Sequence, residues 1–220
     1  MIFTRCLKWS KNYIQLTVSR SFQNALSPML CLVTNTKKNL NADVVWLDME
    51  MTGLDLNTCH ILEIACLITD KNLNVISEDL NIVVHQPDEV LNNMNEWCLK
   101  THQKTGLINE SKLSKVMLQD AEQRVLEYLS TYVKKGISPL AGSSVYVDRM
   151  FLYKYMPMVN DYLHYRIIDT STIKELIKRW NIDVPTFPKQ HKHRALADIQ
   201  ESIKELEHYK KHIFDLSVKA

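Results

Sequence analysis

The sequence contains little glycine and no extended polar linker. Only four glycines occur among its 220 residues, and no low-complexity stretch divides residues 43–214, so we expect one domain there. No run approaches the roughly 20 consecutive apolar residues that a membrane-spanning helix needs, which argues against a membrane partner. The five cysteines include no Cys-x-x-Cys pair, so the sequence supports neither a zinc knuckle nor a disulfide framework.

Acidic residues are absent from the first 42 positions, which carry six Lys or Arg and many hydroxyl and amide side chains. The segment also lacks the continuous apolar core of a secretory signal. This composition is typical of a mitochondrial presequence, and a disordered basic tail is the alternative. We therefore predict that residues 1–42 lie outside the fold and direct the protein to the mitochondrial matrix or intermembrane space, with an additional cytosolic or nuclear pool left open.

Hydrophobic patterning predicts three strands followed by alternating helices and strands. Strands are expected at 44–51, 60–70, 75–85, 137–147 and 165–169, and helices at 114–136, 148–156, 171–180 and from Arg194 onward. The short turn between the second and third strands favours an antiparallel hairpin. This order of elements predicts an α/β fold with a mixed sheet, and residues 215–220 are expected to form a short tail.

Two acids interrupt the first apolar strand. Asp48 and Glu50 stand two positions apart in "VVWLDMEM", so the alternation of a strand points both toward the same face. Neighbouring carboxylates in an apolar setting raise each other's pKa unless a cation offsets their charge, and oxygen ligands suit Mg²⁺ or Mn²⁺. A solvent-facing edge or a pairing arginine is the alternative, so this pair alone is a weak signal.

Three further candidates stand at the expected element ends. Asp148 follows the 137–147 strand and opens a helix, Asp198 lies in the first turn of the last helix, and His193 stands five residues before Asp198. Each has an ordinary alternative, because a first-turn Asp is a common helix-start residue and a loop histidine is often solvated. Glu63, in the second strand, is expected to be a structural acid or to support a metal ligand.

Together the four acids and the histidine resemble a known set. Asp-x-Glu on a first strand, an aspartate after "GSSVYV" and His-x4-Asp at the final helix resemble the DEDDh group of 3′→5′ exonucleases. The segments "WLDMEMTGLD", "SVYVDRMFLYKYMP", "HYRIIDTSTIKELIKRW" and "HRALADIQESIKEL" resemble the oligoribonuclease family, and specifically its mitochondrial animal-type members, over about residues 44–214. The resemblance implies an exonuclease domain over 43–214 with a ribonuclease-H-like fold, a mixed five-stranded sheet flanked by helices.

The resemblance also implies the chemistry. Two divalent cations, Mg²⁺ or Mn²⁺, would be held by Asp48, Glu50, Asp148 and Asp198, in a site for in-line phosphodiester hydrolysis. His193 would act as the general base toward water, and nucleoside 5′-monophosphates would be released. His191 competes for that role, but the family spacing to the final aspartate selects His193.

Members of this family degrade RNA of a few nucleotides, down to dinucleotides. The matching positions are a base wedge (Leu54), an aromatic at the base pocket (Trp97), four residues that cap a 5′ phosphate (His102, Ser144, Arg166, Ser171) and a tyrosine from the second subunit of a homodimer (Tyr165). Ser143 stands where the family usually has Asn. A small substrate also agrees with residues 43–220, whose 21 Lys or Arg against 25 Asp or Glu predict no broad basic surface.

Other functions stay open at this point. A general DEDDh exonuclease would act on longer DNA or RNA, and activity on long strands would favour it. A non-catalytic module would bind short nucleotides without cutting them, but the intact Asp48, Glu50, Asp148, His193 and Asp198 argue against it. A purely structural mitochondrial protein would not need the acids and the histidine together.

Overall fold

A computed structural model describes residues 43–190 and 192–215. The predicted presequence, the competing His191 and most of the expected C-terminal tail lie outside the described residues. The strands are β1 (Val44–Met51), β2 (Ile61–Thr69), β3 (Leu80–Val83), β4 (Leu140–Gly142) and β5 (Ile167–Asp169). The helices are α1 (Asp88–Asn92), α2 (Glu96–Lys104), α3 (Leu107–Leu113), α4 (Leu118–Tyr132), α5 (Tyr146–Tyr155), α6 (Pro157–Tyr162), α7 (Thr170–Trp180), α8 (Ala195–Tyr209) and the π-helical segment η1 (Lys210–Phe214).

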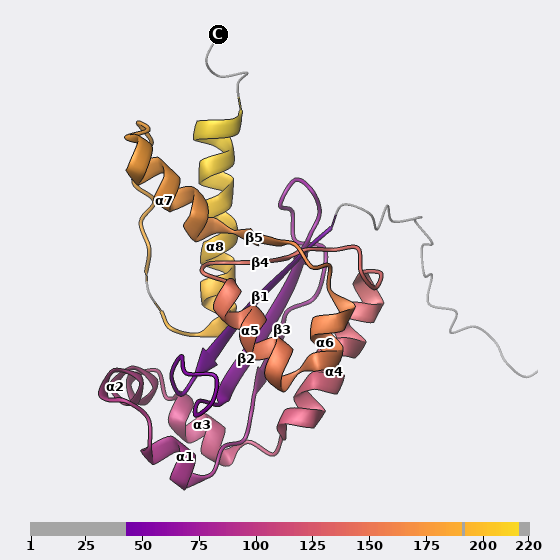
Figure 1. The fold of residues 1–220 in the computed structure, drawn as a ribbon, viewed down its shortest axis with the longest axis vertical. Coiled ribbons are helices and arrows are strands. Elements are labelled where there is room, and N and C mark those ends of the chain that lie inside the picture. Colours follow the sequence, from indigo (N-terminus) through magenta and orange to yellow (C-terminus); the bar gives the residue numbers. More distant parts are fainter. Residues whose placement is uncertain (1–42, 191, 216–220) are drawn as a thin grey trace, which may run out of the picture. The chain divides into compact units, whose positions relative to one another are not determined.

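The five strands form one mixed sheet in the order β3-β2-β1-β4-β5. β1 is antiparallel to β2 and β2 to β3, whereas β1, β4 and β5 are parallel. The β1–β2 pairing runs from Val44 opposite Thr69 to Glu50 opposite Glu63, and its register shifts just before Met51. The predicted mixed five-stranded sheet flanked by helices is therefore confirmed (Figure 1).

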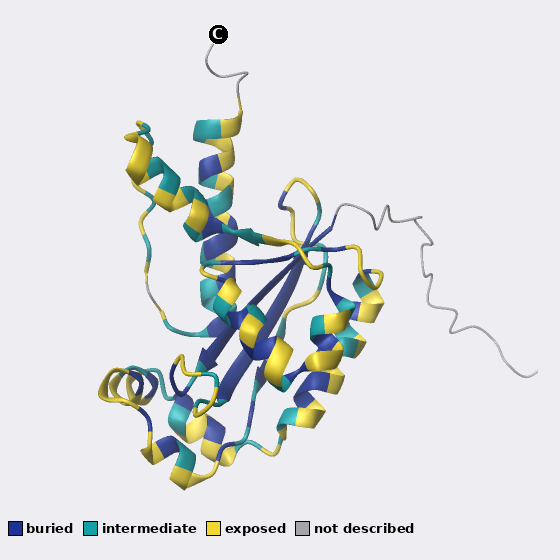
Figure 2. Ribbon diagram, viewed as in Figure 1, coloured by how far each residue is buried: buried dark blue, intermediate teal, exposed yellow. Residues whose placement is uncertain are grey.

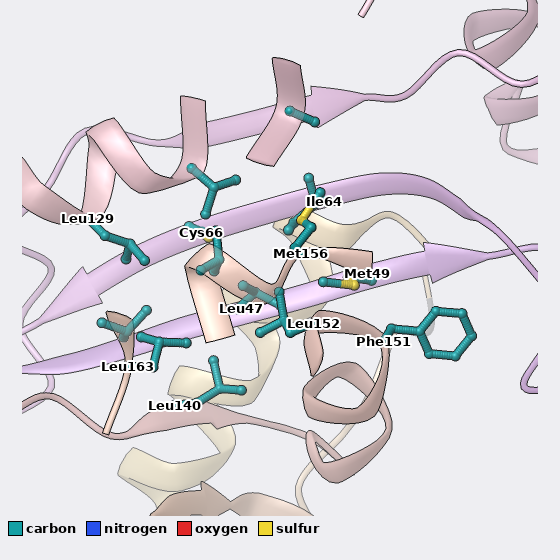
Figure 3. Packing of buried hydrophobic residues seen from close by; sticks show 14 of the residues in the cluster. Leu47, Met49, Ile64, Cys66, Leu129, Leu140, Phe151, Leu152, Met156 and Leu163 are labelled. Carbon is teal, nitrogen blue, oxygen red and sulfur yellow. The ribbon is translucent and has the colours of Figure 1, made fainter. Parts of the chain in front are cut away.

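Helices cover both faces of this sheet, and the alternation along β1 decides what each helix contacts. Val45, Leu47 and Met49 pack with residues of α4, α5 and α6 in the cluster that Figure 3 shows. Val44 and Trp46 point to the other face and pack against α8. Strands buried on both faces are apolar along their whole length, and Figure 2 accordingly shows β1 and β2 almost entirely buried. Asp48 and Glu50 continue the even series, so they lie on the α8 face.

A third apolar cluster attaches the short helices α1, α2 and α3 to β2. Leu62 of β2 packs with Leu91, Cys98 and Leu107, which come from the three helices in turn. His102 of α2 donates to the carbonyl of Met51, the last residue of β1, so α2 lies beside the end of that strand. No helix in the described ranges combines the length and apolar character that crossing a membrane requires.

Four predicted strands are shorter in the structure. The second loses one residue at each end, and the fifth begins at Ile167. The third begins at Leu80, because Val75 makes only an isolated bridge to Thr69 and the hydroxyl of Tyr128 binds the intervening segment at Ser77 and the carbonyl of Glu78. The fourth ends at Gly142, because Ser144 has a left-handed backbone (φ 56°) that a strand cannot continue through.

Several helix boundaries also differ from prediction. The 114–136 helix spans only Leu118–Tyr132. Pro157 does end the preceding helix, but it also starts α6, where its missing N–H costs no hydrogen bond. The helix predicted at 171–180 begins one residue earlier, at Thr170, and its cap is Asp169, whose carboxylate accepts the Ser171 N–H at 2.9 Å.

Candidate active site

Four acids converge where β1 ends and two helices begin. Asp48 and Glu50 come from β1, and Asp148 and Asp198 lie in the first turns of α5 and α8. Figure 1 shows the end of β1 close to the start of α8. Because a helix N-terminus carries partial positive charge, both aspartates occupy positions that favour an anion.

The Asp148 carboxylate is fixed against β1 by the backbone. The N–H of Met49, which lies between the two strand acids, donates to Asp148 Oδ1 at 2.9 Å. A carboxylate oxygen of Glu50, one of Asp198 and a ring nitrogen of His193 lie within 4.8 Å of one another. The structure thus brings the predicted ligands and the predicted base to one place.

Burial and mutual repulsion make this cluster reluctant to carry its full negative charge. Burial raises the pKa of Asp48 well above its ordinary value, and the charges of Asp148, Glu50 and Asp198 add to the rise. Burial, followed by the charge of Asp198, raises the pKa of Glu50 to about 8. Burial also raises the pKa of Asp148 and of Asp198. Such a donor set fits divalent cations, whose charge offsets the repulsion and which prefer oxygen ligands.

His193 lies in the loop directly before α8, in a left-handed backbone conformation (φ 52°) that is uncommon for a residue with a Cβ. Its ring meets that of Trp97 edge-on, with centroids 5.4 Å apart and planes at 87°. Trp97 is 59% exposed although it is large and apolar. An aromatic surface therefore lies open to solvent beside the predicted base.

A cluster of hydroxyls lies near the acids. The Oγ atoms of Ser143 and Ser144 are each 3.0 Å from Ser171 Oγ, and Lys189 donates to Ser143 Oγ at 3.4 Å. These four residues line the same hollow as Asp48, Asp198 and His193. Two of the predicted phosphate-capping residues are thus adjacent, and Ser143, at the position where Asn was usual, joins them.

His102 lies with the acids instead of with the serines. It is buried, its Nε2 donates to the carbonyl of Met51 at 3.0 Å, and its Nδ1 is 3.9 Å from Glu50. Burial lowers the pKa of His102, so the contact with Glu50 is no ion pair at neutral pH. The structure gives His102 a place beside the candidate metal ligand, and its role toward a phosphate stays a prediction.

The remaining predicted substrate residues are exposed. Leu54 and Tyr165 are 70% and 74% exposed, and the guanidinium of Arg166 lies over the Tyr165 ring at 5.3 Å. The individual roles of Leu54, Tyr165 and Arg166 toward a substrate stay predictions.

The sequence did not indicate the contacts of two residues near the site, Lys189 and Arg194. Lys189 forms an ion pair of 2.6 Å with the buried Glu205, and no local pattern marks it. Arg194 binds Glu63 and Glu110, and its position next to His193 was a signal that could have been followed. Glu63 is fully buried and serves as a structural acid.

Comparisons with known proteins show which proteins this chain resembles. A family model described as an exonuclease family, RNase T, matches residues 45–206. A probable oligoribonuclease of Drosophila melanogaster is 52% identical over 177 residues, covering 80% of this chain and 84% of the relative. An oligoribonuclease of Francisella tularensis subsp. holarctica is 49% identical over 174 residues, covering 79% of this chain and 97% of the relative.

A solved structure supports the fold. The zinc-bound form of Escherichia coli exonuclease I in complex with single-stranded DNA matches with a TM-score of 0.63 at 16% identity, over 81% of this chain. The chain spans only 42% of the length of that enzyme. The likeness confirms the predicted ribonuclease-H-like exonuclease fold.

Proposed function

The chain belongs to the oligoribonuclease family of exonucleases and is a 3′→5′ exoribonuclease that acts on short RNA, and we propose that dinucleotides with a 5′ phosphate are its preferred substrates. The observation that carries this proposal is a pair of hollows that share His193. One is lined by the serine cluster, Asp48 and Asp198, and the other by Trp97, Lys100 and Lys104.

Each hollow suits one nucleotide. The aromatic face of Trp97 offers a stacking surface to a base, and stacking on aromatic side chains is the usual way that proteins hold unpaired bases. The hydroxyls of Ser144 and Ser171 offer donors to a terminal phosphate, and Arg166 offers charge. A substrate with one nucleotide in each hollow has its scissile phosphate beside His193.

The four acids would hold two divalent cations, Mg²⁺ or Mn²⁺. When bound, such ions act as Lewis acids that stabilise the attacking and leaving oxygens of an in-line displacement. Asp48 and Glu50 project from the rigid strand β1. The N–H of Met49 holds the Asp148 carboxylate toward the same point. The protein thus supplies a fixed frame of oxygen donors.

His193 supplies the proton transfer. An unprotonated ring nitrogen accepts a proton as water attacks the scissile phosphorus, and the bond from phosphorus to the 3′ oxygen of the preceding nucleotide breaks. That oxygen takes up a proton, so one nucleoside 5′-monophosphate leaves the 3′ end. The proximity of His193 to Glu50 and Asp198 supports this assignment.

We also propose a homodimer in which Tyr165 enters the site of the second subunit. Tyr165 and the neighbouring edge strand β5, where Ile167 is 40% exposed, offer an unpaired apolar surface in the single chain. The composition of residues 1–42 supports a mitochondrial location, and an additional cytosolic or nuclear pool belongs to the same proposal.

Product analysis tests the catalytic proposal. Residues 43–220 are incubated with a 5′-phosphorylated RNA dinucleotide and Mg²⁺, and we expect only nucleoside 5′-monophosphates. Chelator should abolish the reaction, and added Mg²⁺ or Mn²⁺ should restore it. Asp148→Asn should lose nearly all activity, whereas Asp161→Asn, on the exposed surface of α6, should keep it. Binding without cleavage would support the non-catalytic module instead.

A further inference from the structure

Arg194 joins three elements at the point where the His193 loop becomes α8. Its Nε and one terminal nitrogen donate to the carboxylate of Glu63 on β2, at 2.8–3.2 Å. Its terminal nitrogens also donate to the two carboxylate oxygens of Glu110 on α3, at 3.1 and 2.7 Å. The planar guanidinium is thus held from both sides in a fork geometry that an ammonium group cannot reproduce.

The burial of these residues makes the contact more than a surface ion pair. Glu63 is fully buried, and the side chains of Arg194 and Glu110 are 28% and 46% exposed. A buried carboxylate requires a close partner, which ties Arg194 to the sheet. The pair of Arg179 with Glu175 is a useful contrast, because it is exposed and links two residues of one helix at 3.3 Å.

Glu63 also holds the start of α8. Its Oε2 accepts the N–H of Ala195 at 3.1 Å, whereas no side-chain cap comes from the N-cap residue Arg194 itself. The unpaired N–H groups of a first helical turn need such acceptors. The N–H of Asp198 then donates to the carbonyl of Arg194 at 3.0 Å, so the turn that carries Asp198 is fixed to β2.

The same anchor lies next to the acidic site. Glu63 is the cross-strand partner of Glu50 in the β1–β2 pairing, and directly paired residues of antiparallel strands present their side chains on one face. The guanidinium of Arg194 therefore adjoins a candidate metal ligand on one side and the His193 loop on the other. The close approach of Glu50, His193 and Asp198, within 4.8 Å, lies beside this junction.

His193 needs an anchor of this kind. Its left-handed backbone (φ 52°) is a strained conformation that persists only where neighbouring contacts over-determine it. Its ring also packs edge-on against the exposed Trp97. Its covalent neighbour Arg194 is tied to the buried sheet through Glu63.

We propose that Arg194 is a positioning residue for His193, in that its fork between Glu63 and Glu110 holds the base over the acidic site. The inference rests on the proposed role of His193 as general base. Arg194 acts through His193 and through the first turn of α8, so it determines how often the imidazole occupies the productive geometry. Arg194 also lines the hollow of Trp97, so a role in RNA binding would change KM, whereas the positioning role changes kcat.

The test is a double-mutant cycle on 5′-phosphorylated dinucleotide cleavage with Mg²⁺. Arg194→Lys keeps the charge but loses the fork, and we expect kcat to fall roughly 10- to 100-fold, as for a misplaced catalytic group, with KM changed by less than about twofold. In the His193→Ala background the same change should cost less than about twofold, because no base remains to be positioned. The matched control Arg179→Lys should leave kcat unchanged in both backgrounds.

Two further measurements keep the result interpretable. Thermal melting shows whether Arg194→Lys is folded, and if it is not, Glu110→Gln carries the same cycle, since it keeps the buried Glu63 pair and loosens only one arm. An unchanged kcat in a folded Arg194→Lys, or an equal loss with and without His193, would overturn the inference alone. A His193→Ala enzyme with full activity would refute the general base as well, so the two failures are distinguishable.

Discussion

Four carboxylates lie within one small region of this molecule, and their burial and mutual repulsion destabilise the fold when they are ionised. Each has a pKa raised by burial, and Asp48 and Glu50 are raised further by the other acids. In the absence of cations the folded chain therefore holds on to protons that the unfolded chain releases. The free energy of unfolding therefore depends on pH through the ionisation of these four acids.

Without divalent cations, thermal stability should fall as the pH rises. The folded pKa of Glu50 is about 8 and its ordinary value is 4.5, so its contribution is complete below about pH 4.5 and is lost as the pH passes 8. We expect the Tm in chelator to drop by several degrees between pH 5 and 9, since about 1 kcal/mol corresponds to roughly 2–4 °C at this chain length.

Added Mg²⁺ should raise Tm more at pH 9 than at pH 6, because the ion binds the ionised acids of the folded state. Glu50→Gln removes one of the titrating groups and should flatten the decline in chelator, while Glu175→Gln on the exposed face of α7 should leave it unchanged. A Tm that stays level over this pH range in chelator would show that the acids are not mutually destabilising.

At the scale of elements, the start of α7 and the loop after β4 build the hydroxyl cluster together. Asp169 Oδ1 accepts the N–H of Ser171 and that of Ser144, each at 2.9 Å. One carboxylate therefore caps α7 and fixes the left-handed turn at Ser144. The two serines meet because of this shared acceptor, and their hydroxyls are left to face the hollow.

Removal of the Ser171 hydroxyl should weaken the recognition of a 5′ phosphate. For Ser171→Ala we expect kcat/KM on the phosphorylated dinucleotide to fall roughly 10-fold, since a hydrogen bond to a charged group contributes about 1.5–3 kcal/mol. The dinucleotide without a 5′ phosphate should be cleaved almost as by the parent enzyme. Ser130→Ala on the exposed face of α4 is the matched control, and an equal fall on both substrates would argue against a phosphate subsite.

Local sequence patterns predicted the helices and strands that depend on residues close together in the chain. The alternation along β1 placed Asp48 and Glu50 on one face, and the spacing at Arg194 predicted the start of α8, because both depend on residues that are neighbours in the chain. The turn at Ser144 and the cap at Asp169 were missed, since each is stabilised by the other from 25 positions away. The bond from Arg194 to Glu63 spans 131 positions, and no periodicity indicates it.

The family resemblance predicted more of the site than the patterns did. It brought together residues of β1, α5 and α8, which the fold then placed around one point with His193. It grouped His102 with the serines, whereas the structure places His102 beside Glu50. The family resemblance predicts which residues belong to the site. The contacts that those residues make with one another follow only from the packing of the fold.

At the scale of the whole molecule, two hollows share His193, and in the proposed function they set how much RNA the protein holds. The serine cluster, with Lys189 against Ser143, bounds one hollow, and Trp97 bounds the other. Residues 43–220 carry slightly more acidic than basic side chains, which argues against broad neutralisation of a longer strand's phosphates. In this proposal the hydroxyl cluster closes the site on the 5′ side of the second nucleotide. A longer RNA would therefore have no room there for its remaining nucleotides.

The length dependence of cleavage tests this account most directly. The value of kcat/KM is measured with Mg²⁺ on 5′-phosphorylated RNAs of two, three, seven and twenty nucleotides that share one 3′-terminal sequence. We predict the highest value for the dinucleotide, a lower one for the trinucleotide and the lowest for the twenty-mer. Equal values for the dinucleotide and the twenty-mer would contradict the account and would favour a general exonuclease that accepts long strands.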